Sequence, residues 1–248
     1  MIDPIWRSRI DETLSCNDNK YIYRIPGAGV VIDNCQIMHN GLKIVKDCYC
    51  GPSMTQLIKE NKGVHEPQEE YIFQQILPLI RPGSVMVELG SYWAFYSMWF
   101  KIMVPDSRCY MMDEDMSYLD TGKVNFALNY LEGTFALGSV NRNTSIRHIM
   151  GQNSIARIGI LHSDIQHAEV EMLKQGRDLL QFVDYAFIST HSENGHNTVL
   201  DIIKEEMRLI ANINHADTFS VDGLIVGQNK SLGEAKVNYT NKRAQYNA

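Results

Sequence analysis

The chain has 248 residues, of which 44% are hydrophobic and 21% are charged, a composition typical of a globular protein with a sizeable core. The net charge of −6 argues against a protein that grips nucleic acid through its phosphates, because such proteins present a basic surface. No apolar run approaches the roughly 20 residues of a membrane span, and the first residues lack the pattern of a signal peptide. The five cysteines include no CxxC pair. We therefore expect reduced thiols, a cytoplasmic location, and neither a membrane nor a nucleic-acid partner.

The N-terminal part of the chain has a different sequence pattern from the rest. Short β-like runs at residues 21–25 and 29–32 are interrupted by proline and glycine, which predicts a small hairpin or cap. A helix is expected over residues 66–80, because the apolar residues recur there at helical spacing. We therefore divide the chain into a β-rich cap segment, residues 1–60, and a larger domain, residues 61–248.

Strands and helices then alternate along the larger domain. This alternation predicts an α/β protein with a mostly parallel, Rossmann-like sheet and helices on both faces. The last two expected strands follow each other closely, so we expect them to form an antiparallel pair at one edge of the sheet. The expected strands cover residues 84–89, 109–112, 133–140, 157–162, 183–189, the vicinity of 213, and 219–226. The expected helices cover residues 94–103, 115–130, 168–181 and 197–211.

The carboxyl ends of these strands are the expected ligand site, as in other open α/β sheets. Gly90 follows the first strand, where a glycine lets a ligand approach the backbone closely. Asp113 follows the second strand and is placed to accept hydrogen bonds from ribose hydroxyls. This series predicts an adenosine-containing ligand, although a Gly90 that serves only a tight turn stays open as the alternative. The expected cofactor-binding residues are Glu88, Gly90, Ser91, Tyr92, Trp93 and Asp113.

Two further residues are expected near the reacting group. Asp164 ends one strand and could orient a hydroxyl, hold an amine or bind a metal, or it could cap the next helix. His191 ends the following strand, and histidine is a natural base near neutral pH. His162 and His196 could meet both residues around a metal ion, but their spacing matches no known ligand pattern, so no metal is expected. We predict His191 as the general base and Asp164 as the group that positions the acceptor. The alternative is that both are structural.

Three segments resemble motifs of a known family. Residues 87–97 read VELGSYWAFYS, residues 125–129 read NFALN, and residues 160–169 read ILHSDIQHAE. Together they are similar to the motifs of the FkbM family of methyltransferases, over residues 66–226. The resemblance implies a class I, Rossmann-like fold that uses S-adenosylmethionine. It also implies methyl transfer to an oxygen, commonly a hydroxyl of a sugar or secondary metabolite.

The resemblance also suggests roles for individual residues. It implies that Glu88, Gly90 and Ser91 line the methionine end of the cofactor, that Asp113 holds the ribose, and that Asp164 and His191 face the transfer site. Three positions depart from the family pattern: Tyr92 replaces a small or amide residue, while Ala94 and His167 each replace a glycine. These departures predict a wider turn or altered chemistry.

Three functions are therefore compatible with the sequence. The leading one is an enzyme that methylates a hydroxyl of a small molecule or glycan. The alternatives are a non-catalytic module that binds an adenosyl cofactor, and another nucleotide-binding α/β enzyme, for example an NAD-linked one, because the fold alone does not determine the reaction. The sequence leaves the oligomeric state open.

Overall fold

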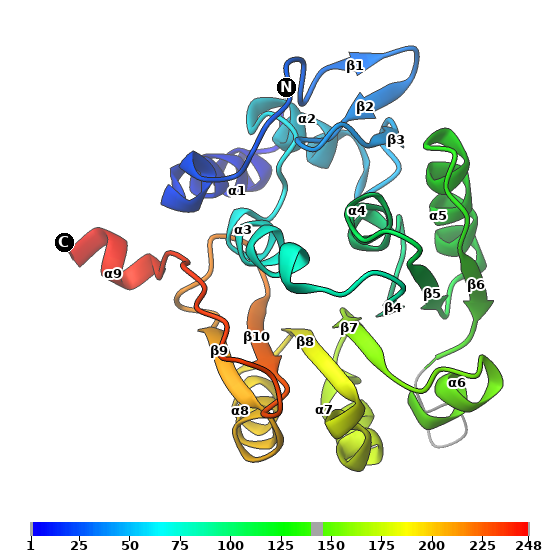
Figure 1. Ribbon diagram of the computed structural model, residues 1–248. Helices are drawn as coiled ribbons and strands as arrows, with labels where there is room; N and C mark the ends of the chain where they lie inside the picture. The colour runs from blue at the N-terminus through cyan, green and yellow to red at the C-terminus, as the bar shows by residue number, and fades with distance from the viewer. Residues whose placement is uncertain (1, 140–145, 248) are drawn as a thin grey trace.

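A seven-stranded sheet runs through the fold of this computed structural model, which describes residues 2–139 and 146–247 (Figure 1). The strands are β4 (Val85–Leu89), β5 (Arg108–Asp113), β6 (Thr134–Leu137), β7 (Ile158–Ser163), β8 (Val183–Thr190), β9 (Arg208–Ile213) and β10 (Gly223–Gln228). Their order in the sheet is β6-β5-β4-β7-β8-β10-β9. Counted from β4, the first five strands follow the doubly wound order 3-2-1-4-5.

The strand directions agree with the expected fold class. The five strands from β4 to β8 pair in parallel, whereas β10 pairs antiparallel with both β8 and β9. The mostly parallel, Rossmann-like sheet with an antiparallel edge is thereby confirmed. The register places Glu88 of β4 between Met111 of β5 and His162 of β7, so the carboxyl ends of these strands meet at one edge.

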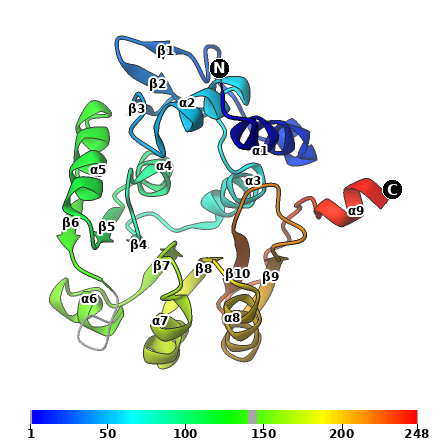
Figure 2. The same cartoon turned by 180° about the vertical axis from the view of Figure 1, so that it is seen from behind.

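Helices cover both faces of the sheet. They are α3 (Pro67–Ile76), α4 (Phe95–Met103), α5 (Met116–Leu128), α6 (Ile146–Gln152), α7 (Glu169–Gly176) and α8 (Glu193–Glu206). Figures 1 and 2 show α3, α4 and α5 on one side and α6, α7 and α8 on the other. Successive strand residues point to opposite faces, so Met86 packs with Phe95 in one hydrophobic core while Val87 packs with Val199 in the other. Within the described residues, no helix combines the length and the apolar character that a membrane crossing requires.

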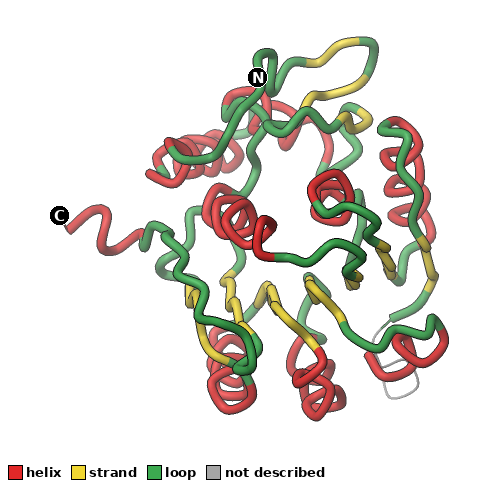
Figure 3. Tube along the Cα trace, viewed as in Figure 1, coloured by secondary structure: helices red, strands yellow, loops and turns green. Residues whose placement is uncertain are grey.

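The N-terminal segment packs against the first of these cores. It contains α1 (Pro4–Ser15), β1 (Val31–Ile32), β2 (Cys35–Ile37), β3 (Lys43–Val45) and α2 (Gly51–Glu60), and β1–β3 form a small antiparallel sheet. Figure 3 shows that the rest of the chain between α1 and α2 is largely loop. Ile10, Met38 and Leu57 share a hydrophobic cluster with Phe73 of the larger domain. The boundary at residue 60 therefore stays a proposal about the chain's organisation.

The strand expected over residues 21–25 is wrong. These residues form a loop whose backbone groups bond to other parts of the chain instead of to a strand partner: Ile25 N–H donates to the His39 carbonyl (2.8 Å), and Tyr23 N–H donates to the Gln74 side chain (2.8 Å). The second expected run, 29–32, is a strand only at Val31–Ile32. Helices α1 and α2 were not expected.

The C-terminal half differs from expectation mainly at element boundaries. The helix expected over residues 197–211 begins earlier, at Glu193, and ends at Glu206, so residues 208–211 belong to β9. The strand expected over 219–226 is β10, Gly223–Gln228. The expected helix over 168–181 is α7 followed by a 3₁₀ turn, and α6 and α9 (Lys242–Asn247) were not expected. For the strand expected over 133–140, β6 ends at Leu137, and residue 140 lies outside the described residues.

Two asparagines, one near the end of α5 and one at its C-cap, hold the N-terminal sheet against the larger domain. Asn125 and Asn129 lie four residues apart and therefore share one face of the helix. Val45 N–H donates to Asn125 Oδ1 (2.9 Å), and Lys43 N–H donates to Asn129 Oδ1 (2.9 Å). The Asn129 amide in turn donates to the Lys43 carbonyl (2.7 Å). The side chains of α5 thus take the place of a partner strand at the edge of β3.

Candidate functional site

A cavity of about 670 Å³ lies at the carboxyl ends of the parallel strands. Its volume is in the range of cofactor and small-molecule sites. One end lies over β4 and β5 and includes Gly90 and Asp113, and the other lies over β7 and β8 and includes His162 and Ser189. The N-terminal segment contributes Tyr49 to the wall. The cavity therefore occupies the position at which open α/β sheets bind their ligands.

The turn after β4 is shaped by a close approach between two backbones. Gly90 has φ +71°, and a Cβ built on it would lie 1.8 Å from the Asp164 carbonyl oxygen. Asp164 N–H donates to the Leu89 carbonyl (2.9 Å), which keeps the two segments together. The fold itself therefore requires glycine at this position, whether or not a ligand also lies against it.

The residues after Gly90 form an aromatic wall. Tyr92 and Ala94 both have positive φ, 39° and 59°, a backbone region that favours glycine. The Tyr92 ring stacks on Tyr118 with 3.7 Å between centroids, and Trp93 stacks on Tyr49 at 4.4 Å. All four rings line the cavity. Flat apolar surfaces of this kind suit a planar ring system such as a purine.

Asp113 ends β5 and lines the same end of the cavity. Its carboxylate accepts the backbone N–H of Tyr92 (3.0 Å, at Oδ2) and that of Asp115 (3.0 Å, at Oδ1). Each carboxylate oxygen keeps a second lone pair, because a carboxylate offers about four acceptor sites. Asp113 therefore holds the two turns in place and can still accept hydrogen bonds from a diol.

His65 lies between two carboxylates at the start of α3. Its Nδ1 is 2.6 Å from Glu70 Oε1, and its Nε2 is 3.2 Å from Glu66 Oε2. Burial alone would lower the pKa of His65, but the charges of Glu70 and Glu66 outweigh it and raise the pKa to about 10. His65 is thus an imidazolium at neutral pH. Of its two partners, Glu66 lines the cavity, whereas Glu70 is fully buried behind it.

His162 has a similar arrangement on β7. Its Nε2 is 2.9 Å from Glu69 Oε1, while Glu88 Oε1 lies 3.8 Å from its Nδ1, beyond hydrogen-bond distance. Burial raises the pKa of Glu88 to about 7 and also raises that of Glu69, although His162 opposes both shifts. His162, Glu69 and Glu88 all line the cavity.

His191 follows β8 and lies behind Asp164. Its Nε2 is 2.9 Å from Asp164 Oδ1 and 3.6 Å from Asp222 Oδ1, and its Nδ1 is 2.5 Å from Glu169 Oε1. Burial would lower the pKa of His191, but hydrogen bonds to Asp164 and Glu169 outweigh it and raise the pKa to about 10. Asp164 lines the cavity, and His191 does not contribute to its wall.

The helix-capping alternative for Asp164 is not observed. The residue at the N-terminus of α7 is Ala168, and no side chain caps this helix. His196, the other histidine of the expected cluster, is buried between Thr190 Oγ1 (2.8 Å) and Asn212 Oδ1 (2.8 Å) and is therefore structural. Within the described ranges, no group of histidine, cysteine and acidic residues has the arrangement of a metal site.

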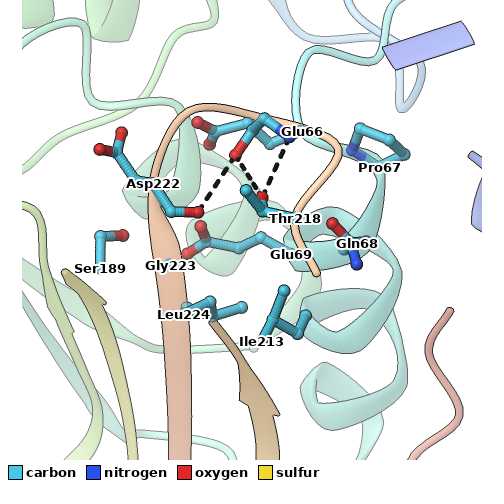
Figure 4. A pocket seen from close by; sticks show the side chains of 11 residues that line it. Glu66, Pro67, Gln68, Glu69, Ser189, Ile213, Thr218, Asp222, Gly223 and Leu224 are labelled. Atoms are coloured by element: carbon cyan, nitrogen blue, oxygen red, sulfur yellow. Dashed lines mark hydrogen bonds between the residues drawn. The ribbon is translucent and has the colours of Figure 1, made fainter. Parts of the chain in front are cut away.

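A small crevice of about 20 Å³ adjoins the end of the cavity that lies over β7 and β8 (Figure 4). Glu66, Glu69 and Ser189 line both the cavity and the crevice, whereas Asp222 lines the crevice but not the cavity. In Figure 4 the carboxylate of Glu69 and the hydroxyl of Ser189 point toward one another. Burial, together with the charge of Glu66, raises the pKa of Asp222 to about 7. The space is large enough for one water-sized group.

The structure brings together most of the residues that the sequence singles out. Glu88, Gly90, Ser91, Tyr92, Trp93, Asp113 and Asp164 all line the cavity, and His191 supports Asp164 from behind. Sequence reasoning missed the contributions of Tyr49, His65 and Glu66. The signal available for the last two was the run HEPQEE at residues 65–70, where three acidic residues and a histidine precede a strongly apolar helix face. A structural role at a helix start explained that run equally well.

The cavity is strongly acidic. Among the described residues that line it there is no lysine or arginine, and seven carboxylates are present: Glu66, Glu69, Glu88, Asp113, Glu114, Asp115 and Asp164. Such a lining favours cationic ligands and disfavours ligands with several phosphates, because like charges in a partly enclosed site repel strongly.

Comparisons with known proteins give only distant likenesses. No protein-family model and no curated protein matches the chain. Among solved structures, it is similar to M. capricolum TrmK in complex with S-adenosyl-homocysteine (15% identity, 65% of this chain, 71% of that chain, TM-score 0.47). It is also similar to a SAM-dependent methyltransferase from Aquifex aeolicus (12%, 63% and 89%, TM-score 0.42) and to a ribosomal protein L11 methylase from Lactobacillus delbrueckii subsp. bulgaricus (10%, 67% and 81%, TM-score 0.49). At such values the likeness does not indicate which cofactor or acceptor this chain binds.

Proposed function

We propose that the chain is an S-adenosylmethionine-dependent methyltransferase that methylates a hydroxyl of a small molecule or glycan, as its resemblance to the FkbM family suggests. The observation that carries the proposal is the acidic cavity at the carboxyl ends of β4, β5 and β7. It is large enough for a cofactor and an acceptor together, and Asp113 lies where a ribose-binding acid is expected.

The residues present fit this cofactor. S-adenosylmethionine carries a sulfonium and an ammonium group, and both are favourable near carboxylates. Glu88, Gly90 and Ser91 would lie along its methionine end, with Tyr92 and Trp93 beside the adenosyl group. The Ser91 hydroxyl is buried and has no hydrogen-bond partner among the described residues, so it is free to bond to a ligand. The same acidic lining would repel the two phosphates of NAD, which makes an NAD-linked enzyme the weaker alternative.

Methyl transfer to a hydroxyl needs an acceptor oxygen aligned with the methyl group and a base that accepts the hydroxyl proton. The cofactor supplies an electrophilic methyl group when bound. The residues of this chain would align the acceptor hydroxyl with that methyl group and take up the hydroxyl proton. Asp164 lines the cavity and would receive that proton, while His191 orients the Asp164 carboxylate. That His191 is itself the general base stays a prediction. This role requires the neutral imidazole, and with a pKa of about 10 only a small fraction of His191 is neutral at pH 7.

Calorimetry with the purified protein tests the cofactor. We expect S-adenosylhomocysteine to bind and to raise the thermal unfolding temperature, because a ligand that binds only the native state stabilises it. NAD⁺ at the same concentration should do neither. Tighter binding of NAD⁺ than of S-adenosylhomocysteine would contradict the proposal.

A further inference from the structure

Three carboxylates, those of Glu66, Glu69 and Asp222, line the small crevice beside the β7–β8 end of the cavity. Seven carboxylates gather around this end: Glu66, Glu69, Glu70, Glu88, Asp164, Glu169 and Asp222. The basic groups that face them are the imidazoles of His39, His65, His162 and His191 and the guanidinium of Arg9, which interacts electrostatically with Glu66 and Asp222. The carboxylates outnumber the basic groups around them, and burial together with neighbouring carboxylates raises the pKa of Glu69 and that of Asp222, the latter to about 7. A cationic group placed among these carboxylates would favour their ionised form.

The crevice also contains a polar group that is ready to bond. Ser189 is 6% exposed, and its hydroxyl has no hydrogen-bond partner among the described residues. It lines both the crevice and the cavity and points toward Glu69 (Figure 4). His162 Nδ1 is likewise buried without a hydrogen bond to the part of the chain that is described. The buried, unsatisfied His162 Nδ1 and the unpartnered Ser189 hydroxyl, both beside a cluster of carboxylates, indicate a site that a polar ligand completes.

The size of the crevice restricts the ligand group. A volume of about 20 Å³ accommodates one group the size of a water molecule, and an ammonium has that size. An ammonium carries three donors and no acceptor, so it can bond to two carboxylates and a hydroxyl at once. The rings of Tyr49 and Tyr96 line the adjoining cavity and favour a cation near their faces.

We infer that the acceptor carries a protonated amine, which binds in the crevice between Glu66, Glu69 and Asp222 and against the Ser189 hydroxyl. This inference rests on the proposed methyl transfer and narrows its acceptor to amine-bearing alcohols, such as amino sugars. An amine held by carboxylates keeps its proton and has no lone pair to attack a methyl group. The amine therefore orients the molecule, and a neighbouring hydroxyl receives the methyl group.

The smallest probe of this site is ethanolamine, with ethylene glycol as its uncharged counterpart of similar size. We would titrate each into ¹⁵N-labelled protein, with and without S-adenosylhomocysteine, and follow the amide resonances of Glu66, Ser189 and Gly223. Ethanolamine should shift them at millimolar concentration, and ethylene glycol should not. The shifts should weaken once the pH exceeds the pKa of the amine.

Variants localise the effect. Glu69→Gln and Glu66→Gln keep the shape of the side chain and remove one charge, so each should weaken ethanolamine binding about tenfold. Asp201→Asn, an exposed control on α8, should leave it unchanged. The inference is overturned if ethylene glycol binds equally well, if neither compound shifts these amides, or if Mg²⁺ shifts them in place of ethanolamine.

The two proposals can fail separately. Ethanolamine binding to a protein that does not bind S-adenosylhomocysteine would leave the ammonium site standing and remove the proposed cofactor. The opposite result would keep the cofactor and remove the ammonium site. A thermal unfolding curve for each variant shows whether a lost response reflects lost charge or lost structure.

Discussion

Gly90 and Asp164 lie so close together that residue 90 has no room for a side chain. A Cβ at Gly90 would come within 1.8 Å of the Asp164 carbonyl oxygen, although 74 positions separate the two residues in sequence. This contact joins the turn after β4 to the turn after β7. Both turns line the cavity, so its shape depends directly on this contact.

Gly90→Ala should therefore destabilise the protein strongly. The substitution combines left-handed strain, about 1–2 kcal/mol, with overpacking against backbone, about 1–3 kcal/mol or more. Gly83→Ala is a matched control, because Gly83 has a similar φ of +76° and open space around it. Urea unfolding should show a clearly larger loss for Gly90→Ala. Equal losses would mean that the turn can shift away from Asp164.

Asp113→Asn should weaken S-adenosylhomocysteine binding by about 1–3 kcal/mol, the scale of hydrogen bonds to a charged group. Glu114→Gln is the matched control, because Glu114 lines the same end of the cavity one residue beyond the end of β5. Calorimetry on both variants decides between the two acids. A loss confined to Glu114→Gln would transfer the ribose-binding role to that residue.

The pH dependence of stability should report the charge on His191. The folded-state pKa is raised from 6.5 to about 10, so this histidine stabilises the fold fully below about pH 6.5 and loses that contribution as the pH rises toward 10. The stability difference between wild type and His191→Gln should shrink over this range in urea unfolding experiments.

His196→Gln provides a control of opposite sign. Burial lowers the pKa of His196, with the Asn212 hydrogen bond opposing, so its stabilising contribution is present above pH 6.5 and is lost as the pH falls. Identical pH profiles for the two variants would mean that neither shift controls stability.

Asn125→Ala should loosen the N-terminal sheet. The substitution removes the acceptor of the Val45 N–H and the donor to the Trp93 carbonyl (3.0 Å), both in buried or half-buried surroundings. The expected cost is about 1–3 kcal/mol. Hydrogen exchange at Val45 should accelerate, while exposed Asn194→Ala leaves it unchanged. Unchanged protection at Val45 would show that hydrophobic contacts alone hold the segment.

The sequence predicted the larger domain well because its central strands β4, β7 and β8 are buried on both faces. A strand such as β4 is continuously apolar up to Glu88 and is followed by a glycine turn, and these signals depend on local sequence alone. The predicted ends of helices and strands were wrong where no proline or glycine separates two elements. Between α8 and β9 the chain runs from Glu206 through Met207 to Arg208 without such a residue, and the helical pattern seemed to continue into the strand.

The N-terminal segment and part of the site depend on contacts between distant residues. Helix α1 buries only Ile10 and Thr13, too few to give a clear helical period. The roles of His65 and Glu66 arise because the residues before α3 lie at the cavity, with His65 against Trp93, and residue spacing does not reveal this contact. By contrast, Gly90, Asp113 and Asp164 follow from one topological rule, namely that ligands bind at the carboxyl ends of strands.

The walls of the cavity come from positions as far apart as Tyr49 and Ser189. Bringing them together closes long loops, and loop closure slows folding more than it affects stability. Helices can form within microseconds, but the cavity exists only after the N-terminal segment has docked on α5 and β8 has joined the sheet. During refolding, binding competence should therefore appear after most of the secondary structure. A ligand that binds only the completed cavity would therefore slow unfolding and leave the early steps of folding unchanged.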